Sequence, residues 1–168
     1  MRTSGSVYVS VVVALLLAYF SYQWWYNPRR AIKRQLGELA ATLSVPPDSR
    51  DGLDRLARAA RLRAYFAPDV RISLGPSRPG LTSRDVLVGA VAAWNPPAGG
   101  WNVSFVDVQI SLDSDATARA YMTVEINSSD PRTGQPAYDA REVRVGMAEQ
   151  EGAWVITTAE PVETLQRP

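Results

Sequence analysis

The hydrophobic positions of the chain follow three successive patterns. Residues 7–25 contain no charged side chain and form one apolar run. From about residue 28 to residue 94, apolar residues recur mostly at every third or fourth position, the period of amphipathic helices. Beyond residue 101 they alternate with polar residues, which predicts half-buried strands. The pattern therefore predicts an α+β domain that follows an apolar N-terminal segment.

The apolar run is long enough to cross a lipid bilayer, which takes about 20 residues. A secretion signal would have a shorter apolar core of roughly 7–15 residues, followed by small residues at a cleavage site. Here the interface is predicted to hold aromatic and basic side chains, namely Trp24, Trp25, Tyr26, Arg29, Arg30, Lys33 and Arg34. We therefore expect a short tail at residues 1–6, an uncleaved transmembrane helix at residues 7–26 and the lipid bilayer as a partner.

Charge predicts the orientation of this anchor. The flank after the run is more positive than the N-terminal tail, which places the domain in the cytoplasm, with an extracytoplasmic or periplasmic domain as the alternative. Residues 1–63 contain ten Lys and Arg against four Asp and Glu, and residues 64–168 contain eight against thirteen. The basic half fits either anionic headgroups or a solvated helix face. The acidic half would repel phosphate, so no nucleic-acid partner is expected.

Three helices are expected between residues 28 and 94. The first begins at Asn27 and Pro28, an N-cap residue and a proline at the first helical position. The second covers about residues 53–66. Its arginines are interpreted as side chains whose stems cover apolar surface, and its apolar side is predicted to comprise Leu53, Leu56, Ala60 and Phe66.

One strand and the third helix follow. Alternation in "APDVRISLG", residues 67–75, predicts a half-buried strand. The third helix is expected to begin at Thr82, with Asp85 three residues later as the carboxylate of a capping box. Its buried stripe is predicted to comprise Val86, Leu87, Ala90, Val91 and Trp94, and the segment "NPPAGG" ends it.

Four antiparallel strands are expected after residue 101, joined as a meander. They cover about residues 103–112, 116–126, 137–147 and 154–165. The apolar positions change parity near Phe105 and Val106, which predicts a bulge or bend there. Helices on one face of a curved, mainly antiparallel sheet form an α+β layer.

This order of elements resembles the nuclear transport factor 2-like (NTF2-like) fold, a cone shared with ketosteroid isomerase and the SnoaL-like polyketide cyclases. The resemblance covers residues 31–165 and is carried by "LRAYFAPDVRISL", "SRDVLVGAVAAW" and "AWVITTAEPVETL". It implies one cone-shaped domain at residues 27–168, with a pocket between sheet and helices. Enzymes of the family use a pocket acid, often with a histidine, and this chain has no histidine.

Two sets of candidate site residues follow. The ligand pocket is predicted to involve Tyr65, Trp94, Asp139 and Arg141, although solvated positions for Asp139 and Arg141 are the alternative. The partner face is predicted on the outer side of a strand, through which members of the family often dimerise, and comprises Arg119, Tyr121, Thr123 and Glu125.

The residue content excludes several kinds of chemistry. The chain has no cysteine and no histidine, which excludes thiol nucleophiles, thiolate metal sites and the commonest general base. No catalytic residue, metal or cofactor is therefore assigned. We expect a membrane-anchored, non-catalytic domain that binds a partner protein or a small apolar ligand. The alternatives are a SnoaL-like or ketosteroid-isomerase-like enzyme that uses Asp139 or Asp69, and a subunit of a cell-envelope or secretion complex.

Overall fold

The computed structural model describes residues 12–15, 27–47, 52–75, 79–94, 99–129 and 133–162. Beyond the short helical segment at residues 12–15, the chain forms helices, a 3₁₀ turn and strands in the order α2 (Pro28–Leu43), α3 (Gly52–Leu62), η1 (Arg63–Tyr65), β1 (Phe66–Ile72), α4 (Arg84–Ala93), β2 (Trp101–Leu112), β3 (Thr117–Ser129), β4 (Pro136–Gln150) and β5 (Ala153–Pro161).

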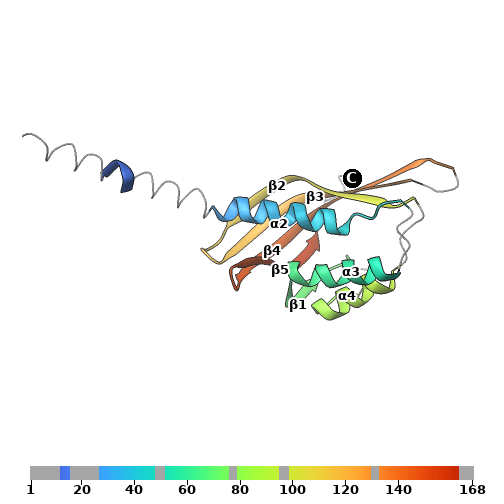
Figure 1. The fold of residues 1–168 in the computed structure, drawn as a ribbon, viewed down its shortest axis with the longest axis horizontal. Helices are drawn as coiled ribbons and strands as arrows, with labels where there is room; N and C mark the ends of the chain where they lie inside the picture. The colour runs from blue at the N-terminus through green and yellow to red at the C-terminus, as the bar shows by residue number, and fades with distance from the viewer. Residues whose placement is uncertain are drawn as a thin grey trace, which may run out of the picture.

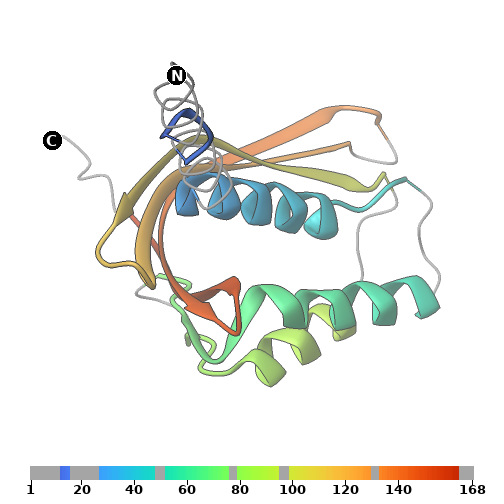
Figure 2. The same cartoon turned by 60° about the vertical axis from the view of Figure 1, so that its left-hand side comes forward.

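The strands form one mixed sheet in the order β1-β5-β4-β3-β2. β2 to β5 pair antiparallel with their neighbours in sequence, and β1 joins the edge parallel to β5. The sheet curves around the helices, with α2 over one half and α3 and α4 beside the other (Figures 1 and 2). The predicted α+β architecture and meander are therefore confirmed.

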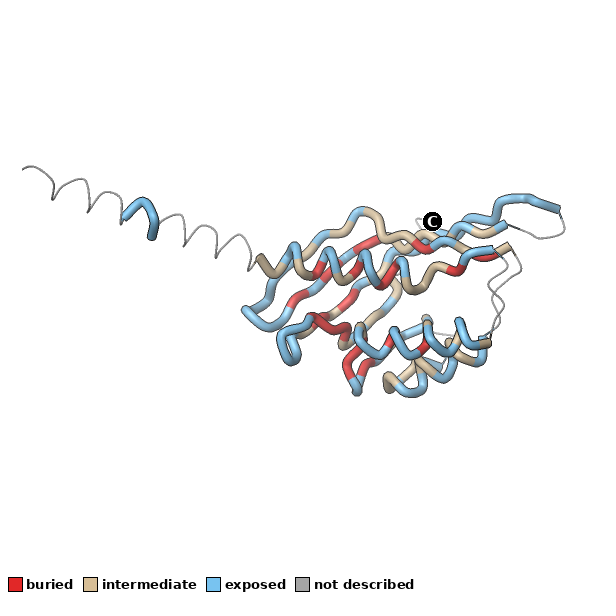
Figure 3. The backbone as a smooth tube through the Cα atoms, viewed as in Figure 1, coloured by how far each residue is buried: buried red, intermediate tan, exposed pale blue. Residues whose placement is uncertain are grey.

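Alternation along the strands builds the core. Ala118, Ala120 and Met122 of β3 are buried, while Arg119 and Tyr121 between them are exposed. The buried positions of β3 face buried or half-buried positions of β4, and α2 adds further buried side chains between its own axis and the sheet (Figure 3). The core lies where α2 meets the concave face of the sheet, as the period of two predicts.

The bulge predicted near Phe105 and Val106 lies at Asp107 in β2. The register between β2 and β3 shifts between Val106 and Gln109, and Asp107 has a positive φ of 54°. Apolar side chains therefore reach the core from odd positions before the bulge and from even positions after it, namely Val103, Phe105, Val108 and Ile110. A bulge inserts one extra residue into a strand, so the positions that face the core change from odd to even numbers beyond it.

Helix α2 begins as predicted. Asn27 is its N-cap and accepts a hydrogen bond from the backbone N–H of Arg29 over 3.1 Å, and Pro28 occupies the first helical position. The apolar side of the helix is buried against the sheet, with Ile32 and Leu36 almost fully inaccessible. α2 thus fixes one wall of the cone.

Helix α3 is rotated about its axis relative to the prediction, so that a different face is buried. Leu53 and Leu56, assigned to its apolar side, are 73% and 60% exposed, and the buried positions are Ala59 and Leu62. The chain leaves the helix at Leu62 for the turn η1, so Phe66 belongs to β1. In a helix, positions 55, 58, 59 and 62 share one face, and positions 53, 56 and 60 share another. Packing of Ala59 and Leu62 therefore decides the rotation and turns Leu53 and Leu56 outward.

Helix α4 also differs from its prediction in two details. Its N-cap is Ser83 rather than Thr82, and the Ser83 hydroxyl accepts a hydrogen bond from the Val86 N–H over 3.3 Å. Val86 is 50% exposed, and the helix has no buried residue. Asp85 instead forms an ion pair with Arg63 over 2.7 Å.

The prediction of a single-pass membrane protein with a cytoplasmic domain is wrong on this structure. A membrane span requires a continuous apolar helix of about 20 residues, and no helix among the described residues is long and apolar enough. Of the predicted anchor, residues 12–15 are described as helical, and Trp24, Trp25 and Tyr26 lie outside the described residues. The predicted basic interface residues lie exposed on the first turns of α2, namely Arg29, Arg30, Lys33 and Arg34.

Candidate ligand pocket

A cavity of about 600 Å³ lies between the helix pair α3–α4 and the sheet, beside the C-terminal end of α2. Its size falls within the range of about 300–1,000 Å³ that small-molecule sites occupy. The lining is mostly apolar and comes from elements far apart in sequence, namely Leu43, Val45, Arg55, Arg58, Leu74, Leu81, Leu87, Ala90, Val91, Trp94, Trp101 and Ile126.

One wall of the cavity is the apolar stripe of α4. Leu87, Ala90, Val91 and Trp94 follow one another at helical spacing, and all four line the cavity. None of them is buried. The stripe that the sequence predicts as buried core is therefore only partly covered: Leu87 and Val91 pack beside the core, and the rest of the stripe borders the cavity.

A stacked pair of tryptophans forms the second wall. The ring centroids of Trp94 and Trp101 are 4.1 Å apart, with an interplanar angle of 21°. The indole N–H of Trp101 donates to the carbonyl of Leu43 over 2.7 Å, and the backbones of Trp101 and Val45 exchange two hydrogen bonds of 2.9 Å. These contacts tie the start of β2 to the end of α2, so the aromatic wall is held in place.

The third wall, from α3, carries the charge of the site. Arg55 and Arg58 lie one turn apart and both line the cavity. Among the described residues that line the cavity, none is Asp or Glu. Within the described part of the chain, the side chain of Arg58 makes no hydrogen bond or ion pair, and no group of acidic side chains could hold a metal ion. Since guanidinium groups stay protonated, the cavity can bind and stabilise negative charge, but the described residues of its lining include no general base.

The pocket residues predicted from sequence occupy different places. Trp94 lines the cavity. Tyr65 packs against the core, and its hydroxyl lies 3.3 Å from the hydroxyl of Thr42. Asp139 and Arg141 are exposed on β4, where they form an ion pair with each other over 3.2 Å. The structure thus separates Trp94 from the other three, and a ligand-binding role for each stays a prediction.

Sequence reasoning missed Arg55, Arg58 and Trp101. Both faces of α3 show helical spacing, because the leucines and the arginines each recur at every third or fourth position. Hydrophobicity favoured the leucine face as the inner one. The signal that favours the other face is Ala59 and Leu62, which lie on the same side as the arginines.

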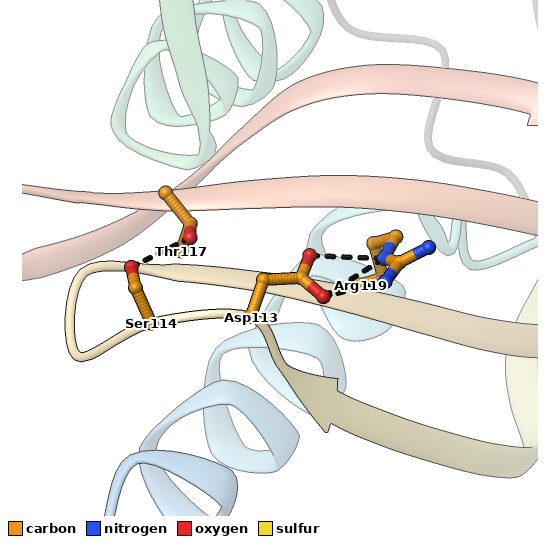
Figure 4. Close-up of polar contacts among 4 residues, drawn as sticks. All are labelled: Asp113, Ser114, Thr117 and Arg119. Carbon is orange, nitrogen blue, oxygen red and sulfur yellow. Dashed lines mark hydrogen bonds and ion pairs between the residues drawn. The ribbon is translucent and has the colours of Figure 1, made fainter.

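The predicted partner face lies on the outer side of β3. At the start of β3, Arg119 forms an ion pair with Asp113 across the β2–β3 turn. The Nη2 and Nε atoms of Arg119 lie 2.6 Å and 2.9 Å from the two carboxylate oxygens (Figure 4). This hydrogen bonding by Arg119 lowers the pKa of Asp113. Ser114 and Thr117 close the same turn through their hydroxyls, which are 2.7 Å apart (Figure 4).

The rest of this face is also paired within the chain. The guanidinium of Arg144 lies 5.0 Å from the ring centre of Tyr121. The carboxylate of Glu125 accepts hydrogen bonds from Ser104 over 3.2 Å and from the hydroxyl of Tyr138 over 2.9 Å, and the latter bond raises the pKa of Tyr138. Thr123, which lies between Tyr121 and Glu125 along β3, is half-buried. A role in partner binding stays a prediction.

No protein-family model matches the chain, and no curated protein matches it. Solved structures do resemble it. A protein from Novosphingobium aromaticivorans, provisionally named scytalone dehydratase, is 17% identical with a TM-score of 0.62, and covers 80% of this chain and 82% of its own. ActVI-ORFA from Streptomyces coelicolor is 16% identical with a TM-score of 0.61, over 80% of this chain and 95% of its own.

A third structure covers more of the chain. An NTF2-like protein with a cystatin-like fold, also from Novosphingobium aromaticivorans, is 12% identical with a TM-score of 0.63, and covers 92% of this chain and 90% of its own. Identities this low establish the fold and leave the activity open. The chain adopts the cone-shaped α+β fold of NTF2-like proteins.

Proposed function

We propose that this protein binds a small, mainly apolar molecule in the cavity between α3, α4 and the sheet. The observation that carries the proposal is the stripe on α4, where Leu87, Val91 and Trp94 face the cavity and none is buried. An apolar stripe on a helix is normally stabilised by burial against other apolar groups. A ligand in the cavity supplies that burial.

The similar structures support a second candidate, turnover of the bound molecule by an enzyme of the dehydratase or cyclase kind. They favour this predicted alternative over a membrane-anchored binding domain. The carboxylates proposed as bases do not favour it, because Asp69 and Asp139 are exposed and neither lines the cavity. Binding alone therefore agrees better with the geometry, and turnover comes second.

The test is to fill the cavity without changing the fold. In Val91→Trp the larger ring occupies the space beside α4, and in the control Val86→Trp the same change falls on a position that is 50% exposed on the same helix. The full chain is titrated with the neutral dye N-phenyl-1-naphthylamine, whose fluorescence rises in apolar surroundings. We expect Val91→Trp to weaken dye binding at least tenfold and Val86→Trp to leave it unchanged.

Two results contradict the proposal. One is wild-type protein that does not bind the dye, and the other is Val91→Trp binding as tightly as Val86→Trp while circular dichroism shows both folded.

The second candidate is tested by incubating the protein with scytalone, the compound in the name of one similar structure. Mass spectrometry distinguishes the candidates, because dehydration removes one water from the molecule and binding leaves its mass unchanged.

A further inference from the structure

Two arginines of helix α3 face the cavity, whereas two of its leucines face solvent. Arg55 and Arg58 line the apolar cavity, while Leu53 and Leu56 are mostly exposed. The hydrophobic effect favours the reverse arrangement for a helix that packs on a core. Packing of Ala59 and Leu62 sets the rotation, and as a consequence two guanidinium groups lie at an apolar cavity.

The surroundings of the two guanidinium groups favour the binding of an anion. The other described residues of the lining are apolar or aromatic, and none of them carries a carboxylate. In such surroundings, water screens charge less than it does at an open surface, so a guanidinium attracts an anion more strongly. Arginine binds a carboxylate in a planar arrangement, often through two parallel hydrogen bonds.

We infer that the pocket selects molecules in which a flat apolar body carries a carboxylate, with Arg58 and Arg55 binding the carboxylate and the Trp94–Trp101 wall contacting the body. The inference rests on the proposed function, because it names the class of ligand for the same cavity. Arg58 is the better of the two arginines to replace in a test, since Arg55 makes a further interaction within the chain.

The test compares 2-naphthoate with 2-naphthamide, which share shape and aromatic body and differ in charge. Binding of both to the full chain is measured by isothermal titration calorimetry at low salt. We expect wild-type protein to bind 2-naphthoate at least about tenfold more tightly than 2-naphthamide, because hydrogen bonds between a guanidinium and a carboxylate are charge-assisted. In Arg58→Gln this preference falls to about twofold or less, while the affinity for 2-naphthamide changes little.

The control is Arg61→Gln, which removes the same charge from an exposed position on the same helix. It should keep the preference, and raising the salt concentration should weaken 2-naphthoate alone. If Arg58 only covers apolar surface with its stem, Arg58→Gln lowers stability and leaves the ratio of the two affinities unchanged, which overturns the inference. Equal affinity of wild-type protein for both probes overturns it as well. Absence of binding by either probe overturns the proposed function itself.

Discussion

The rotation of α3 can be tested by comparing two leucines of that helix. Leu62 is fully inaccessible, while Leu56 is 60% exposed. Replacing each by alanine removes the same three carbon atoms from the same helix. If the rotation is as described, Leu62→Ala and Leu56→Ala differ strongly in their effect on the free energy of unfolding.

The expected size follows from burial. Loss of three buried carbons costs about 2.4 kcal/mol of transfer free energy, at about 0.8 kcal/mol per carbon. At Leu62 a cavity is added to this loss, so the total becomes about 3–5 kcal/mol. At Leu56 less than half of the side chain is removed from water and solvent fills the space, so the cost is about 1 kcal/mol or less.

Urea denaturation followed by circular dichroism measures both changes. With a denaturant slope of about 2 kcal/mol per molar, Leu62→Ala moves the midpoint down by about 2 M and Leu56→Ala by about 0.5 M. Leu53→Ala, at a position that is 73% exposed, should behave like Leu56→Ala. Equal losses for Leu56→Ala and Leu62→Ala would show that both faces of α3 are covered, and the assignment of the arginines to the cavity would then be refuted.

Two further predictions concern the backbone and the charged turn. Gly100 has a φ of 68°, and a Cβ there would meet the backbone of Val45 and Pro46, so Gly100→Ala should destabilise the protein by roughly 1–3 kcal/mol in the same urea assay. Asp113 has a pKa below its ordinary value of 3.8, so its ion pair stabilises the fold above that value and the contribution is lost as pH falls through the lowered pKa. Arg119→Gln should return the pKa of Asp113 toward 3.8 in an NMR titration, and an unchanged titration would contradict the pairing.

Sequence determined most of the sheet. Alternating residues in β3 set which side chains enter the core, and the change of parity in β2 located the bulge at Asp107 to within two residues. The N-cap at Asn27 and the apolar side of α2 were also predictable. These features depend on neighbours in sequence, because strand and helix periods and capping are local.

Tertiary structure decided the site. α3 carries two faces with helical spacing, and only packing of Ala59 and Leu62 determines that Arg55 and Arg58 turn inward. The stripe of α4 has the pattern of a core helix, but the structure covers it only in part, through the stacking of Trp94 on Trp101 and the packing of Leu87 and Val91 beside the core. Hydrophobic periodicity states which side of a helix is apolar, whereas the distance to the next element depends on the whole fold. The contacts that make the candidate pocket are therefore long-range ones, and the sequence pattern alone does not contain them.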